Sequence, residues 1–191
     1  MQTIDEVGVA EQTINKSKFF AWVANCHTEQ AVAAFLRAIA TKNQNAHHLA
    51  YAFRIKTPDG IVPRFSDAGE PSGTAGMPLL QIIEGRDLIN VCIAVIRYYG
   101  GVNLGKGGLV RAYGGTGKLA VEATNIMPYV EMHELMLTID YKRVDELTRV
   151  VSQLNGKIID KSFAESVNIK VRLPALEKQT LIDRFQTNYG Q

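Results

Sequence analysis

The sequence predicts an α+β fold in two domains, residues 1–128 and 129–191. Two observations lead to this prediction. Up to about residue 124, strand-like segments rich in β-branched and aromatic residues are interspersed with apolar residues at helical spacing. After a boundary at residues 125–128 the rhythm changes, and the segments follow the order strand, helix, strand, strand, helix. A chain of 191 residues has room for two small domains.

The first domain opens with two expected strands, residues 7–14 and 18–24, joined by a turn at 15–17. Thr28 is a suitable N-cap for a helix that continues to about residue 41. The apolar residues of this helix recur at helical spacing: Val32, Phe35, Leu36 and Ile39.

A hairpin is expected next, because residues 48–55 alternate as a strand and Pro58-Asp59-Gly60 is a strong turn signal. The returning strand, residues 61–65, leads directly into a loop without apolar periodicity. A helix then begins near Pro78 and ends at Gly85.

Residues 88–96 are almost continuously apolar, which is typical of a strand buried on both faces. A glycine-rich stretch follows, and then a helix over residues 109–123. Three glycines inside that helix each weaken it by about 1 kcal/mol relative to alanine, so we expect its backbone to pack closely against the sheet or a ligand. They are Gly114, Gly115 and Gly117.

The second domain is expected to contain a strand at 135–139, a helix at 144–154, strands at 157–164 and 167–173, and a helix from 174 to about 189. This order is that of a ferredoxin-like split βαβ unit without its last strand.

Bulk composition places the chain among ordinary globular proteins. It is 46% hydrophobic and 21% charged with a net charge of +2, which argues against disorder and against a strongly basic nucleic-acid-binding tract. No apolar run approaches the roughly 20 residues of a membrane helix, and no signal peptide is recognisable. Cys26 and Cys92 lie outside any CxxC pattern, so we expect a cytoplasmic protein without a metal framework or cofactor.

The loop at residues 64–76 combines hydroxyl residues, two carboxylates, three glycines and an arginine. It is either a connector or a functional segment. Asp67 and Glu70 are weak catalytic candidates, since paired carboxylates serve acid–base chemistry or hold a cation. Alternatively, Asp67 caps its own backbone and Glu70 pairs with Arg64. His48 is a third weak catalytic candidate; it and His47 begin a strand, so only one of them can face the loop.

The second glycine-rich stretch, residues 100–108, fits most of a P-loop pattern between a buried strand and a helix. The position that requires Ser or Thr for Mg²⁺ is Gly107, which argues against a nucleotidase. Backbone N–H groups at the helix start, with Arg97, Lys106 and Arg111 nearby, form a candidate anion site. A tight structural turn is the alternative.

These motifs resemble the IMPACT family, in particular its bacterial members of the YigZ type. The resemblance rests on Arg64 to Gly76, on Arg97-Tyr98-Tyr99-Gly100-Gly101 and on Leu104 to Tyr113, and it covers nearly the whole chain. One departure concerns Ala68, where the family commonly carries a second consecutive acidic residue; a metal-holding role for that carboxylate is therefore in doubt here.

The resemblance implies a first domain like domain two of a small-subunit ribosomal protein, with helices on one face of a β-sheet. It implies a ferredoxin-like βαββα second domain resembling the C-terminal part of elongation factor G. It also implies a connection with translation, because the eukaryotic relatives regulate translation through a protein partner.

Three functions follow as hypotheses. The first is a regulatory module that binds RNA, the ribosome or a translation factor through a glycine-rich groove, with basic groups for phosphates and aromatic rings for bases. The second is an enzyme acting on an anionic small molecule, and the third is a protein–protein adaptor. The residues expected to bind the anion or nucleic acid are Arg64, Ser66, Ser72, Gly73, Thr74, Arg97, Tyr98, Gly100, Gly101, Lys106, Gly107, Gly108, Arg111 and Tyr113.

Overall fold

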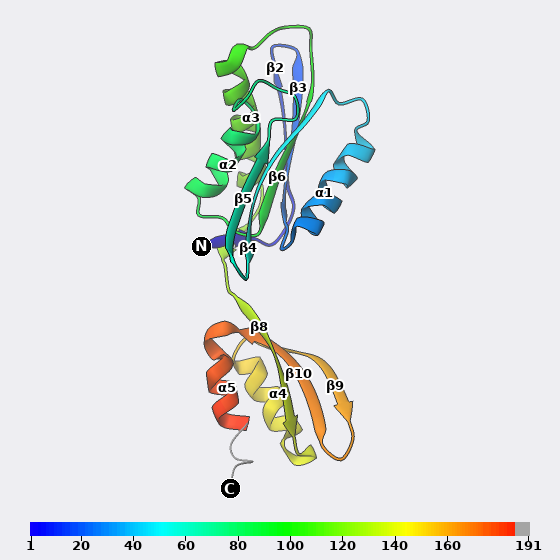
Figure 1. Cartoon of the computed structure of the whole chain (residues 1–191), viewed down its shortest axis with the longest axis vertical. Helices are drawn as coiled ribbons and strands as arrows, with labels where there is room; N and C mark the ends of the chain where they lie inside the picture. The colour runs from blue at the N-terminus through cyan, green and yellow to red at the C-terminus, as the bar shows by residue number, and fades with distance from the viewer. Residues whose placement is uncertain (186–191) are drawn as a thin grey trace. The chain divides into compact units, whose positions relative to one another are not determined.

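The computed structural model describes residues 1–185 and divides the chain into two compact units. The first unit is Met1–Tyr129, and the second begins at Val130. Figure 1 shows both units, each with its own sheet and helices. None of the helices within the described residues is long and apolar enough to cross a membrane.

The N-terminal unit is built on a five-stranded sheet in the order β2-β3-β6-β4-β5. Every neighbouring pair is antiparallel. The strands are β2 (Gly8–Ile14), β3 (Ser17–Asn25), β4 (His48–Thr57), β5 (Gly60–Ser66) and β6 (Val91–Tyr98). The central strand β6 is buried along almost its whole length, which confirms the expected burial on both faces.

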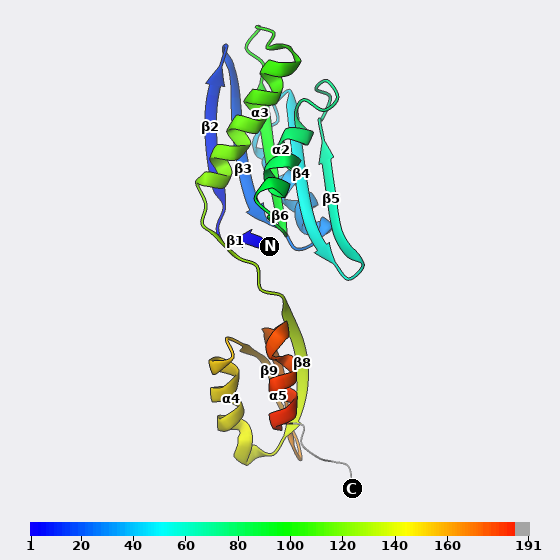
Figure 2. The same ribbon diagram turned by 90° about the vertical axis from the view of Figure 1, so that its left-hand side faces the viewer.

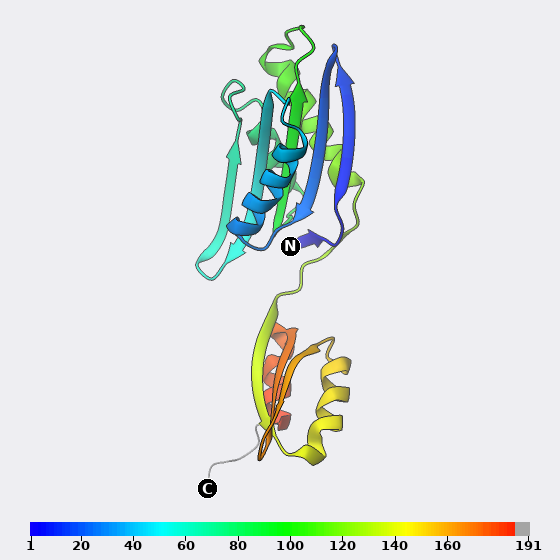
Figure 3. The same cartoon turned by 90° about the vertical axis from the view of Figure 1, so that its right-hand side faces the viewer.

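Helices cover both faces of this sheet, so the expectation of helices on one face is wrong. Helix α1 (Glu29–Lys42) lies on one face, as Figure 3 shows, and buries Val32 and Ile39 against the sheet. Helices α2 (Gly76–Gly85) and α3 (Gly105–Glu122) cover the opposite face, as Figure 2 shows. The physical reason lies in β6, because a strand that is apolar on both sides requires cover on both sides.

Close packing of α2 against α3 explains one of the glycines in the long helix. A Cβ atom at Gly117 would lie 2.5 Å from a methyl carbon of Leu79. Close packing at this glycine is therefore confirmed, but its nearest partner is α2 and not the sheet or a ligand as expected.

The C-terminal unit contains the expected strand–helix–strand–strand–helix order. Strands β8 (Met132–Ile139), β9 (Lys157–Phe163) and β10 (Val167–Pro174) form an antiparallel sheet in the order β8-β10-β9. Helices α4 (Val144–Gln153) and α5 (Lys178–Phe185) bury Leu147 and Leu181 against it, and the short 3₁₀ turns Tyr141–Arg143 and Ala175–Glu177 precede these helices. The strand order is that of the split βαβ unit.

The structure also differs from the expected elements in places. A small antiparallel pair, β1 (Gln2–Ile4) with β7 (Ile126–Pro128), was not predicted. Strand β6 begins at Val91 and not at 88, and helix α3 begins at Gly105 and not at 109. The part of the last predicted helix beyond residue 185 lies outside the described residues.

Candidate functional site

Asp67 organises the loop between β5 and α2. One of its carboxylate oxygens accepts the N–H of Gly73 at 2.8 Å. The other accepts the N–H groups of Ala75 and Gly76 at 2.9 and 2.8 Å. Burial alone would raise the pKa of Asp67, but these three N–H groups lower it below its usual value. Asp67 therefore caps its own loop and the start of α2, as the structural alternative expected.

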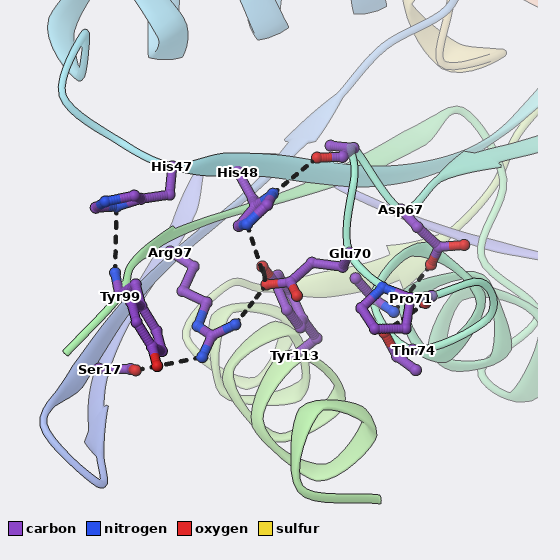
Figure 4. Close-up of polar contacts among 12 residues, drawn as sticks. Ser17, His47, His48, Asp67, Glu70, Pro71, Thr74, Arg97, Tyr99 and Tyr113 are labelled. Carbon is purple, nitrogen blue, oxygen red and sulfur yellow. Dashed lines mark hydrogen bonds and ion pairs between the residues drawn. The ribbon is translucent and has the colours of Figure 1, made fainter. Parts of the chain in front are cut away.

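Glu70 belongs to a different, buried cluster, so the two carboxylates of the loop do not converge. Its side chain is only 4% exposed, and one oxygen accepts hydrogen bonds at 2.8 Å from both the Arg97 guanidinium and the Tyr113 hydroxyl. Figure 4 shows Glu70 pointing toward Arg97 and away from Asp67. The expected pairing of Glu70 with Arg64 is wrong; the partner comes from the end of the central strand.

Arg97 is held from several sides within this cluster. It donates to the Ser17 hydroxyl at 3.4 Å and lies over the rings of Phe19 and Tyr99, 5.6 and 5.1 Å from their centroids. Burial, and then the hydrogen bond to Glu70, raise the pKa of the Tyr113 phenol well above its usual range. Tyr113 therefore stays protonated and acts as a donor.

The two histidines separate as strand geometry requires. His48 Nδ1 lies 2.9 Å from the Ala68 carbonyl oxygen, and because a carbonyl can only accept, Nδ1 carries the proton. Its Nε2 faces Glu70 at 3.9 Å. His47 turns the other way, and its Nδ1 accepts the N–H of Tyr99 at 3.2 Å. The prediction that only one histidine faces the loop is confirmed.

The glycine-rich stretch after β6 lies against the β2–β3 turn. A Cβ atom at Gly100 would lie 2.1 Å from the Lys16 carbonyl group, so only glycine fits. The Gly100 N–H donates to the Ser17 hydroxyl at 3.2 Å. Helix α3 then starts without a side-chain cap, and its first turn carries the exposed Lys106. Figure 1 shows the β2–β3 turn and the start of α3 at the same end of this unit.

The composite groove expected from the sequence is wrong in its composition. Arg64 lies opposite Phe53 in the β4–β5 register, which places it on the α1 face. Tyr98 packs on that face too and donates to Asn43. Glu70 and Tyr113 lie on the α2–α3 side of the sheet. Tyr113 is fully buried and not exposed as expected, and the buried Arg97 is committed to Glu70.

The smaller residues of the predicted groove serve the loop backbone. Ser66 accepts the N–H of Ala68 at 3.2 Å, and Thr74 donates to the Pro71 carbonyl at 2.6 Å. Ser72 is exposed, and Gly73 adopts a positive φ of 74°. Gly101, Gly107 and Gly108 belong to the stretch around the start of α3.

Sequence reasoning missed Ser17, which joins Arg97 to Gly100 from the β2–β3 turn. The available signal was Arg97 itself, since a charged residue ending a strand buried on both faces requires buried partners. The described residues contain no group of three or more His, Cys, Asp or Glu side chains able to hold a metal ion.

Two family models match this chain. Residues 15–121 match the Impact N-terminal domain, and residues 137–189 match DUF1949, a domain of unknown function. The chain belongs to the IMPACT family. The Escherichia coli family member YigZ is 35% identical over 88% of this chain and 83% of its own length.

One solved structure shares this architecture over nearly the whole chain. A crystal structure of a hypothetical protein aligns with 96% of this chain and 89% of its own, at 30% identity and a TM-score of 0.72. The structure of the translational regulator Yih1 aligns with 62% of this chain and 47% of its own, at 26% identity and a TM-score of 0.43. The second overlap is too loose to support an inference about this chain.

Proposed function

We propose that this IMPACT family member is a cytoplasmic, translation-related regulatory protein that binds RNA, alone or within the ribosome, at one end of its N-terminal unit. The observation that carries the proposal is the internal use of both loop carboxylates. Asp67 is saturated by three backbone N–H groups, and Glu70 is neutralised by Arg97. A loop whose acidic groups are all engaged supplies a rigid shape and no free catalytic carboxylate.

Three exposed cations lie at this end of the unit, and we call them the cationic rim: Lys16, Lys106 and Arg111. Lys16 lies in the turn that contacts Gly100, and Lys106 lies in the first turn of α3. The Arg111 guanidinium lies near Gly107, 3.6 Å from the position of a Cβ atom there. Uncapped N–H groups at the start of α3 add positive potential. This arrangement suits a phosphate backbone.

Binding of a fluorescein-labelled 12-nucleotide single-stranded RNA, followed by anisotropy against salt concentration, tests the proposal. Neutralising phosphates with cations gives a linear fall of log affinity with log salt. Replacing both Lys106 and Arg111 by alanine is expected to reduce the slope by about 1.4, or about 0.7 for each lost contact to a single strand. Lys118→Ala, which removes one exposed positive charge farther along α3, is the control and is compared with Lys106→Ala alone. A salt-independent affinity, or equal effects of the rim and control variants, contradicts the proposal.

A second candidate function rests on His48. Its Nδ1 is fixed on the Ala68 carbonyl while Nε2 lies 3.9 Å from Glu70, an orientation common in general bases. The reaction would act on an anionic small molecule. A thermal-shift screen of nucleotides and phosphorylated metabolites tests it, because a ligand at 100 times its dissociation constant stabilises by about 2.7 kcal/mol. A hit that His48→Gln abolishes supports this function, and a screen without hits contradicts it.

A further inference from the structure

Three aromatic rings line up on the α1 face of the N-terminal sheet. Phe20 and Trp22 project from β3, with ring centroids 6.4 Å apart and planes inclined by only 24°. Tyr98 projects from β6 and meets Phe20 edge-on at 5.9 Å. All three are half-buried. We call these residues the aromatic strip.

Helix α1 leaves the outer side of this face open. Its buried residues Val32 and Ile39 pack with side chains of β3, β4 and β6, and the three rings of the strip pack only partly against the cluster that contains Ile39. Val9, the cross-strand neighbour of Trp22 on the edge strand β2, is 52% exposed. Figure 3 shows α1 crossing in front of the sheet with β2 and β3 beside it. The strip therefore borders a part of the face that no described helix covers.

Cations accompany the strip. Lys18 precedes Phe20 on the same face and is the cross-strand neighbour of Tyr98. The Tyr98 hydroxyl donates to Asn43 at 3.1 Å, and the exposed Lys42 precedes Asn43 at the end of α1. Glu11, opposite Phe20 on β2, is an exposed acidic neighbour. These two lysines and one glutamate give the surroundings of the strip a net positive charge, which complements a polyanion.

The strip also adjoins the cationic rim. Lys16 lies in the turn at the start of β3, two residues before Lys18, and its carbonyl contacts Gly100 just beyond Tyr98. A strand of nucleic acid bound at the rim would reach the rings without leaving the protein surface.

We propose that the aromatic strip is a stacking platform for the bases of single-stranded RNA. This inference rests on the RNA-binding function proposed above and assigns to it the α1 face and an unpaired strand. Two near-parallel rings, those of Phe20 and Trp22, flanked by an edge-on Tyr98 and bordered by lysines suit base stacking without sequence reading, because every base has a π face. Double-stranded RNA hides those faces and does not fit the strip.

The chain provides its own reporter, because Trp22 is its only tryptophan. Titration with a 12-nucleotide uridine oligomer is expected to quench Trp22 fluorescence in step with the anisotropy of the labelled oligomer. A 12-base-pair RNA duplex at the same phosphate concentration is expected to leave that fluorescence unchanged. Quenching by the duplex as strong as that by the single strand overturns the inference.

Phe20→Leu tests the stacking directly, since it keeps an apolar side chain and removes the ring. The uridine oligomer is expected to bind about 5- to 150-fold more weakly, the range that one base–aromatic stack spans. Phe65→Leu is the matched control: Phe65 is 40% exposed and pairs with Ala52, so it lies on the other face. Trp22 emission without oligomer shows whether each variant is folded. Equal affinities of both variants overturn the inference.

Failure of the inference differs from failure of the proposed function. If the oligomer binds in a salt-dependent way that requires Lys106 and Arg111 but Trp22 is not quenched, the function stands and the stacking platform is refuted. If no oligomer binds by anisotropy, both are refuted. Without oligomer, Trp22 emission is expected to depend on protein concentration only if a second copy of the chain binds the strip. Such a shift therefore also refutes the stacking platform.

Discussion

Replacing Asp67 by asparagine tests how the loop is held. The amide oxygen still accepts the N–H groups of Ala75 and Gly76, but the amide nitrogen then faces the N–H of Gly73, donor against donor. Leaving the Gly73 N–H without a partner costs about 1–2 kcal/mol at this half-buried position. The hydrogen bonds from Ala75 and Gly76 lose the negative charge of their acceptor and weaken by about 0.5–1 kcal/mol each. The expected loss of stability is therefore about 3 kcal/mol.

Urea unfolding followed by Trp22 fluorescence measures this loss, because that single tryptophan reports on the N-terminal unit. With a typical slope of about 2 kcal/mol per molar urea, the midpoint is expected to fall by about 1.5 M. Glu11→Gln makes the same carboxylate-to-amide change on an exposed strand position and is expected to stay within about 0.5 kcal/mol. An Asp67→Asn midpoint equal to that of Glu11→Gln refutes the reasoning.

The pH dependence gives a second check on Asp67. Burial opposes ionisation, yet the three N–H groups prevail and lower its pKa in the folded state. The stabilisation is then fully present above the unfolded-state value of about 3.9 and is lost as pH falls through the folded-state pKa. The stability difference between the wild type and Asp67→Asn is thus expected to be constant between about pH 5 and 8 and to shrink below about pH 4.

Three further predictions concern the surroundings of the loop. Arg97→Met leaves the buried Glu70 carboxylate without its cation and is expected to lower the free energy of unfolding in urea by about 3–5 kcal/mol. Adding Glu70→Met is expected to recover part of that loss, and a double variant less stable than Arg97→Met contradicts the ion pair. Gly100→Ala places a Cβ atom inside the Lys16 carbonyl and is expected to lower the urea midpoint, and an unchanged midpoint refutes the contact. Burial raises the pKa of Cys26 to about 11 and that of Cys92 well above its usual value, so both thiols should resist a thiol reagent at pH 8 until urea unfolds the chain.

Local signals in the sequence located most elements of the fold. Thr28 caps α1 as expected, accepting the N–H of Ala31 at 3.1 Å, and Gly85 ends α2. Both features depend only on residues within one helical turn, so the local sequence is enough to predict them. The pair β1 with β7 joins residues more than a hundred positions apart, and no local pattern in two three-residue strands announces it.

The sequence led us to expect that the two glycine-rich segments meet, but not which side chains lie between them. The two glycine-rich segments do lie on either side of one cluster, through Glu70 and Arg97. The face of Arg64, however, follows from the hairpin register, because Thr57 opposite Gly60 sets Arg64 opposite Phe53. Counting the hairpin register from the turn would have placed Arg64 on the opposite face of the sheet from Arg97. The burial of Tyr113 depends on how α3 packs on the sheet, which residue spacing alone does not determine.

The strand order has a consequence for synthesis. Strands β2 and β3 form one hairpin and β4 and β5 another, and β6 lies between them although it is the last of these five strands in the sequence. While only the first 90 residues have left the ribosome, the two hairpins lack the strand that joins them, and their apolar faces have no partner sheet. Translation at 5–20 residues per second leaves the hairpins apart for some seconds. Until β6 emerges, the apolar faces of both hairpins stay unpaired, which exposes the nascent chain to aggregation.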